Sequence, residues 1–138
     1  MENIFKEPQG TYNKDRDFTS LICWQNAREV KLFFYKKILP ILPNEEKFNL
    51  CIQIRKSSCS STANIAEGYG RYSFQEGLQF YRISKGSSYE SKDHLISCYD
   101  FGYINETLYN EGLVLIENAK ISLNGYINFF KKQKEGLR

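Results

Sequence analysis

The side chains best suited to chemistry are one glutamate, the only histidine of the chain and one arginine. Glu90 and His94 are four residues apart, so they share one face of any helix that carries both. Arg55 falls on the apolar face of a different predicted helix, so its guanidinium should be partly buried. A buried charge needs a partner, and Glu67 and Glu90 are the candidates. Such an ion pair would fix helix register or subunit packing. Catalysis would require these groups to meet in an open pocket, and no nucleophile accompanies them.

The number of available ligands argues against a metal centre. A di-iron bundle takes two Glu-x-x-His pairs and two further glutamates, whereas this chain has a single histidine. The four cysteines are widely spaced without a CxxC pair, so a structural zinc site is not expected. We therefore expect no enzyme, no cofactor and no metal. His94 is interpreted as an interior or interface residue, and a metal site at an oligomer axis is the alternative.

Short basic clusters could contact the phosphates of a nucleic acid. The candidate contacts are Lys36, Lys37, Lys56, Arg82, Lys85, Lys131, Lys132 and Lys134. Several lie near tyrosines, which could stack on single-stranded RNA but serve core edges and interfaces equally well. The last eight residues carry four basic side chains and one acidic, whereas the other 130 residues balance at fifteen of each sign. The basic excess is therefore terminal, and a solvated chain end is the alternative interpretation.

The elements that position these residues are helices. The chain has only three prolines, none after Pro43, and a strand-rich domain would need more turn residues. A first helix is expected from about Phe18 to Pro40, with Cys23, Ala27, Val30, Phe34 and Ile38 on one stripe. A second is expected to be capped by Asn44 and to end at Gly68, with a face of Phe48, Cys51, Ile52, Cys59, Thr62, Ile65 and Ala66.

The second half of the chain has clearer boundaries. Ser73 and Glu76 form a capping box that predicts a third helix running to Phe101. Its stripe comprises Phe74, Leu78, Tyr81, Ser84, Ser88, Ser91, Leu95 and Cys98. Gly102 should close that helix, and Asn105 should cap a fourth. The fourth stripe comprises Tyr109, Leu113, Ile116, Ala119, Lys120, Leu123, Ile127 and Phe130.

Four amphipathic helices with short connections predict an all-α, antiparallel up-down-up-down four-helix bundle. We expect a flexible arm over residues 1–17, the bundle over 18–130 and a basic tail over 131–138. The serine-rich segment 57–62 is kept within the second helix, because the stripe stays in phase on both sides of it. Its small side chains would let that helix approach the serines of the third closely. No signal peptide or membrane span is recognised, so a cytoplasmic protein with reduced thiols is expected.

Several motifs resemble one known family. The string Asn64-Ile-Ala-Glu-Gly68, followed by Arg71, Phe80 and Gly86-Ser-x-x-Glu90, is similar to the signature of the bacterial four helix bundle protein family. Members of that family are often encoded inside intervening sequences of large-subunit ribosomal RNA genes. The likeness covers residues 18–130, and its motif positions are Arg55, Asn64, Glu67, Gly68, Arg71, Phe80, Gly86, Ser87 and Glu90.

The resemblance implies a homopentameric ring and kinship with the accessory variability proteins of diversity-generating retroelements, which bind a reverse transcriptase and RNA. It implies no catalytic residue. The functional hypothesis is a non-enzymatic homo-oligomer that binds RNA, or a ribosome- or reverse-transcriptase-associated partner, through repeated basic patches. The alternative is a protein–protein adaptor that does not bind nucleic acid.

Overall fold

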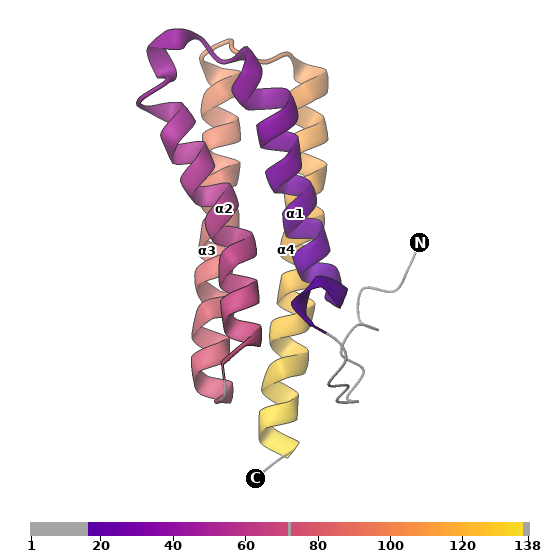
Figure 1. Cartoon of the computed structure of the whole chain (residues 1–138). Coiled ribbons are helices and arrows are strands. Elements are labelled where there is room, and N and C mark those ends of the chain that lie inside the picture. Colours follow the sequence, from indigo (N-terminus) through magenta and orange to yellow (C-terminus); the bar gives the residue numbers. More distant parts are fainter. Residues whose placement is uncertain (1–16, 72, 137–138) are drawn as a thin grey trace.

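The computed structural model describes residues 17–71 and 73–136, and within these ranges it contains helices and no strand. The main helices are α1 (Ile22–Phe33), α2 (Leu50–Tyr69), α3 (Phe74–Asp100) and α4 (Glu106–Gly136). In Figure 1 the chain rises through α1, descends through α2, rises through α3 and descends through α4. The predicted all-α bundle is confirmed, and α4 continues past Phe130 through the first six residues of the proposed tail.

The N-terminal half is less regular than predicted. A short 3-10 helix η1 (Phe18–Ser20) precedes α1. The two are separate helices because the backbone of Leu21, which lies between them, is extended. After α1 come a π-helical turn η2 (Phe34–Ile38) and a 3-10 helix η3 (Leu39–Ile41) that contains Pro40. Asn44 does not cap α2; it begins a separate 3-10 helix η4 (Asn44–Glu46). The carboxylate of Glu46 then accepts hydrogen bonds from the Leu50 amide at 3.3 Å and the Tyr103 hydroxyl at 2.7 Å.

The ends of α3 and α4 form as predicted. The Ser73 side chain accepts a hydrogen bond from the Glu76 amide at 3.1 Å. Gly102 follows α3 with φ +77°, a left-handed conformation that glycine adopts without steric cost. The Asn105 side chain accepts a hydrogen bond from the Leu108 amide at 2.8 Å and caps α4. These caps fix where the two longest helices begin, and therefore which of their side chains lie at the same level.

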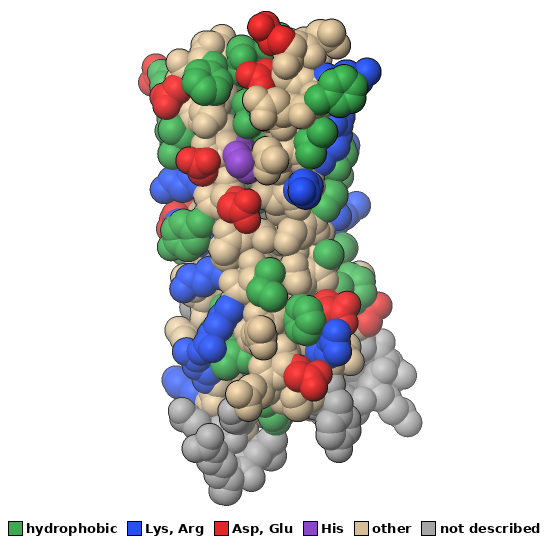
Figure 2. Space-filling model, turned by 90° about the vertical axis from the view of Figure 1, so that its left-hand side faces the viewer, with side chains coloured by type: hydrophobic (Ala, Val, Ile, Leu, Met, Phe, Trp, Pro, Cys, Tyr) green, Lys and Arg blue, Asp and Glu red, His purple; other side chains and the backbone are tan. Residues whose placement is uncertain are grey.

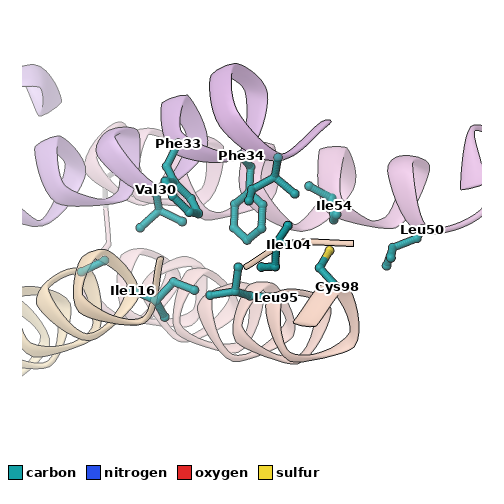
Figure 3. Packing of buried hydrophobic residues seen from close by; sticks show 11 residues of the cluster. Val30, Phe33, Phe34, Leu50, Ile54, Leu95, Cys98, Ile104 and Ile116 are labelled. Atoms are coloured by element: carbon teal, nitrogen blue, oxygen red, sulfur yellow. The ribbon is translucent and has the colours of Figure 1, made fainter. Parts of the chain in front are cut away.

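The core consists of two hydrophobic clusters stacked along the bundle. The cluster in Figure 3 contains Val30, Phe33, Phe34, Ile38, Leu50, Ile54, Leu95, Cys98, Ile104, Ile116 and Ala119. The second, which includes the residues nearest the α2–α3 turn, contains Leu21, Cys23, Ala27, Ile65, Tyr81, Leu123, Tyr126 and Ile127. All four main helices contribute to each cluster, so both clusters lie inside the bundle.

The predicted buried face of α2 is only partly correct. Phe48 precedes the helix and is 81% exposed, and Cys59 is also exposed. Cys51, Thr62 and Ile65 of the predicted face are buried, and the other buried positions are Leu50, Ile54, Ser57, Ser58, Ser61 and Gly68. Arg55 lies on the opposite, exposed side, so its predicted burial is wrong. The error arose because small serines occupy the buried face, and a search for apolar residues does not find them.

The serines of α2 and α3 meet directly, as the sequence indicated. The Ser84 hydroxyl donates to the Ser61 carbonyl at 2.7 Å, and the Ser91 hydroxyl donates to the Ser57 hydroxyl at 3.1 Å. At the outer edge of the contact, the Ser60 and Ser87 hydroxyls are 2.8 Å apart. Residues later in α2 therefore meet residues earlier in α3, so the two helices are antiparallel.

Candidate nucleic-acid interface

The basic residues singled out in the sequence do not all lie together. Lys36 and Lys37 lie in η2, where Lys37 forms an ion pair with Glu111 at 2.7 Å. Lys56 lies on α2 and lines an open groove that also includes Glu90. Nothing is described for the Lys134 side chain. Lys36 and Lys37 therefore lie outside the helices that carry Arg82 and Lys85, and Lys56 lines the groove between α2 and α3.

One face of α3 carries three basic residues and a tyrosine. Arg82, Lys85, Tyr89 and Lys92 follow one another at spacings of three, four and three, which places them in a single row along a helix. Arg82 is exposed, Lys85 and Lys92 are half-buried, and Tyr89 is 50% exposed. Their stems cover the helix surface while the charged ends reach solvent.

The row continues onto α4 through one contact. The Lys120 ammonium lies 4.1 Å from the centroid of the Tyr89 ring, a cation–π distance. The Lys120 side chain is only 10% exposed, and its ammonium lies 3.6 Å from the carboxylate of Glu117, one turn earlier. Lys131 follows Lys120 by eleven residues, about three turns, so it is on the same side of α4. The row on α3 therefore borders α4.

We call Arg82, Lys85, Lys92, Lys120 and Lys131 the basic strip. Because Lys120 is level with Tyr89 and α4 runs back along α3, the strip extends for roughly 20 Å at about 1.5 Å per residue. Among the described residues, only Lys120 of this set has an ion-pair partner. In Figure 2, which views the α2–α3 face, basic side chains gather along the lower left edge, where α3 turns toward α4. Elsewhere on that face, charges of both signs are mixed.

Sequence reasoning found part of this surface. It named Arg82, Lys85 and Lys131, as well as Lys132, which is exposed on the next position of α4. It missed Lys92 and Lys120. The spacing of Lys92 from Lys85 was a usable signal, whereas Lys120 looked like a core position because it falls on the apolar stripe of α4.

The motif residues near the α2–α3 turn have structural roles. Arg71 forms an ion pair with Glu67 at 2.9 Å, and its guanidinium lies 4.7 Å from the Phe80 ring centroid. The Asn64 amide donates to the Ser60 carbonyl at 2.8 Å. A Cβ on Gly68 would lie 2.6 Å from the Tyr81 ring, so only glycine allows this approach. The contacts of Arg71 and Gly68 hold the turn against α3, whereas the Asn64 hydrogen bond lies within α2.

The remaining motif residues lie on the outer face of α2 and α3. Glu90 borders the open groove of about 470 Å³, whose other lining residues are Gln53, Lys56, Ser57, Cys59, Ser60 and Ala63. Gly86 faces open space, and nothing within the chain explains a glycine there. Ser87 is bonded to Ser60, as described above. Within the described ranges of one chain Arg55 has no ion pair with Glu67 or Glu90, so it does not fix the register of α2 and α3, and a pairing between subunits stays a prediction.

Among the described residues, Glu90, His94 and Arg55 form no ion pair with one another. His94 Nδ1 lies 3.8 Å from the Asp93 carboxylate, and its buried Nε2 has no partner among the described residues. In the same ranges no cluster of three or more potential metal ligands is found. Burial raises the pKa of the Tyr81 and Tyr126 phenols well above the ordinary value, so both stay protonated in the core. What the surface offers is therefore charge and aromatic area.

The comparisons with known proteins identify a family. The sequence model of the family described as 23S rRNA-intervening sequence protein matches residues 19–125, which is most of the chain. No curated protein matches the chain. Within the part of the chain that the structure describes, no helix combines the length and apolar character needed to cross a membrane.

Proposed function

The chain belongs to the 23S rRNA-intervening sequence protein family, and from this premise we propose that it is a non-enzymatic, homo-oligomeric RNA-binding protein. The observation that carries the proposal is the basic strip. Four of its five cations have no acidic partner within ion-pair distance in the described ranges, so they are available to phosphates. A row of cations along two antiparallel helices suits an extended polyanion better than a compact ligand.

The mechanism is electrostatic. Each cation that replaces a counterion at a phosphate makes the affinity fall with salt, with a slope of roughly −0.7 per contact for a single strand. Contacts from the four unpaired cations would therefore give a slope of about −3 in log affinity against log salt. Phosphate contacts position the ligand without reading its bases, so the strip by itself confers little sequence preference.

Self-association would multiply a weak site. The groove between α2 and α3 carries Lys56 and Glu90 on opposite sides, a pairing of charges that a second copy of the chain could complement. The family resemblance implies a pentamer, in which five copies of the basic strip would bind one RNA with the avidity of linked sites. Light scattering on the 16.2 kDa chain tests this part directly, since a monomer would remove avidity from the mechanism.

The binding test uses two charge reversals at exposed residues. Arg82→Glu changes the strip, whereas Lys36→Glu makes the same change outside it. Fluorescence anisotropy with a labelled RNA should show several-fold weaker binding and a salt slope reduced by about one for Arg82→Glu only. Equal losses for both variants would remove the strip from the mechanism. If the unaltered protein bound no RNA at low salt, the adaptor alternative would replace this proposal.

A further inference from the structure

One aromatic side chain interrupts the basic strip. Tyr89 lies between Lys85 and Lys92 on α3, and half of its surface is exposed. An aromatic ring placed on the outside of a helix gains little from solvent, but it offers a flat apolar surface to a nucleobase. The cations on either side would bring the phosphates of a strand to the level of this ring.

The ring is held in place by its neighbour. Lys120 is almost buried, and its ammonium lies 4.1 Å from the centroid of the Tyr89 ring. The Glu117 carboxylate, one turn earlier, lies 3.6 Å from that ammonium. Because the cation restrains the tyrosine, little side-chain freedom remains to be lost when a ligand stacks on it.

Two other exposed aromatics, Phe48 and Tyr99, lack this setting. Phe48 lies beside Lys47, but it follows the acidic pair of η4, Glu45 and Glu46. Tyr99 is stacked on Tyr109, with ring planes at 9° and centroids 4.3 Å apart. That ring therefore already has an aromatic partner. Tyr89 is the half-exposed ring that lies within the basic strip.

We propose that Tyr89 is a base-stacking residue and that the basic strip therefore selects single-stranded over double-stranded RNA. The inference rests on the proposed function. In a duplex the base faces are covered by neighbouring base pairs, and an A-form helix offers side chains mainly phosphates and 2′-hydroxyls. In a single strand each base has a free π-face, and stacking on an aromatic side chain tolerates any sequence.

The test compares two labelled probes, an unstructured oligouridine and a perfectly paired RNA hairpin of equal charge. Tyr89→Ala should weaken oligouridine binding roughly 5- to 150-fold, the range for losing one stacked base. Tyr89→Phe keeps the ring and should bind as the unaltered protein does. Tyr89→Leu keeps apolar volume without a π-face and should behave like the alanine variant. The salt slope should not change, because no charge is removed.

The outcomes separate the two proposals. If the unaltered protein binds neither probe, the RNA-binding function itself fails. If it binds both probes equally, or if Tyr89→Ala weakens both to the same extent, the single-strand selection is overturned while the electrostatic function stands. If Tyr89→Leu binds oligouridine as well as Tyr89→Phe does, stacking is overturned. A thermal melt of each variant shows whether a loss reflects unfolding.

Discussion

Helix α3 makes two contacts of opposite character along its length. Toward α2 it presents serines, whose hydroxyls bond to the backbone and to other serines, as between Ser84 and Ser61. Toward α4 it presents aromatic rings. The centroid of the Tyr81 ring lies 5.0 Å from that of Tyr126 and 5.2 Å from that of Phe130, with the ring planes at 74° and 89°. The first contact is made of small polar groups and the second of large apolar surfaces.

The difference shows how one helix can serve two purposes. Small side chains let α2 and α3 approach closely and leave only a shallow, open groove outside. Aromatic packing between α3 and α4 buries more apolar area, while cations beside it occupy the outer surface. The α2–α3 contact should therefore be sensitive to added volume, and the α3–α4 contact to removed volume.

The largest effect is expected from truncating the α3–α4 contact. Tyr81 is fully buried against two rings, so Tyr81→Ala should lower the free energy of unfolding by about 3–5 kcal/mol. Urea denaturation followed by circular dichroism measures this loss. Tyr99→Ala, at an exposed stacked pair in the same contact, is the control and should cost about 1 kcal/mol. Equal losses at both positions would contradict the assignment of this contact to the core.

Enlarging the α2–α3 contact should give the next largest effect. Ser84 is fully buried against Ser61, so Ser84→Leu should destabilise the protein by about 1–3 kcal/mol through overpacking. Ser84→Ala removes the hydroxyl without adding volume, and we expect it to cost at most about 1 kcal/mol. The same denaturation assay distinguishes them. A leucine variant as stable as the alanine variant would mean that the helices can separate freely.

A smaller effect should appear only at high pH, at the end of the bundle where η4 meets the α3–α4 loop. The hydrogen bond to Glu46 raises the pKa of Tyr103 to about 12, above its ordinary value of about 10. The contribution of this hydrogen bond to the free energy of unfolding is therefore complete below pH 10 and is lost as the pH rises toward 12. Tyr103→Phe should be less stable than the unaltered protein at pH 9, and the gap should close by pH 12. A difference in stability that stays constant from pH 9 to pH 12 would show that the Tyr103 hydroxyl does not have a raised pKa.

The smallest effect is expected on the outer side of α2. Cys59 is exposed, whereas burial raises the pKa of the Cys98 thiol to about 12. A thiol reagent at pH 8 should modify Cys59 at least about ten times faster than Cys98, as mass spectrometry of the peptides would show. Modification of Cys59 should leave the unfolding midpoint nearly unchanged. Rapid reaction of Cys98 in the native protein would mean that the core opens more readily than the packing indicates.

The fold could be predicted from the sequence wherever apolar stripes and caps agree. The stripe of α3, the Ser73 side-chain cap and the cap at Asn105 are confirmed, whereas the Glu76 carboxylate of the predicted capping box lies 3.7 Å from Arg71. The buried face of α2 is predicted only in part, because it is lined with serines and the helix starts after a 3-10 turn that precedes Leu50. The error at Arg55 followed directly from the incorrect part of that face.

The candidate interface was only partly predictable for a different reason. The row from Arg82 to Lys92 depends on helical spacing alone, which a sequence shows. Its continuation through Lys120 depends on which α4 residue lies level with Tyr89, and periodicity within one helix carries no such information. The lysine was assigned to the core stripe, and its burial agrees with that assignment, yet its ammonium meets an exposed ring.

The serine contact between α2 and α3 also has a calorimetric consequence. The heat capacity change of unfolding comes from exposing apolar surface and is reduced by exposing polar surface. Because this contact buries hydroxyls, the whole protein should show a heat capacity change below the usual 12–15 cal/mol/K per residue, and a correspondingly flatter curve of stability against temperature. On cooling, apolar burial weakens, so the aromatic contact between α3 and α4 would lose strength before the serine contact does.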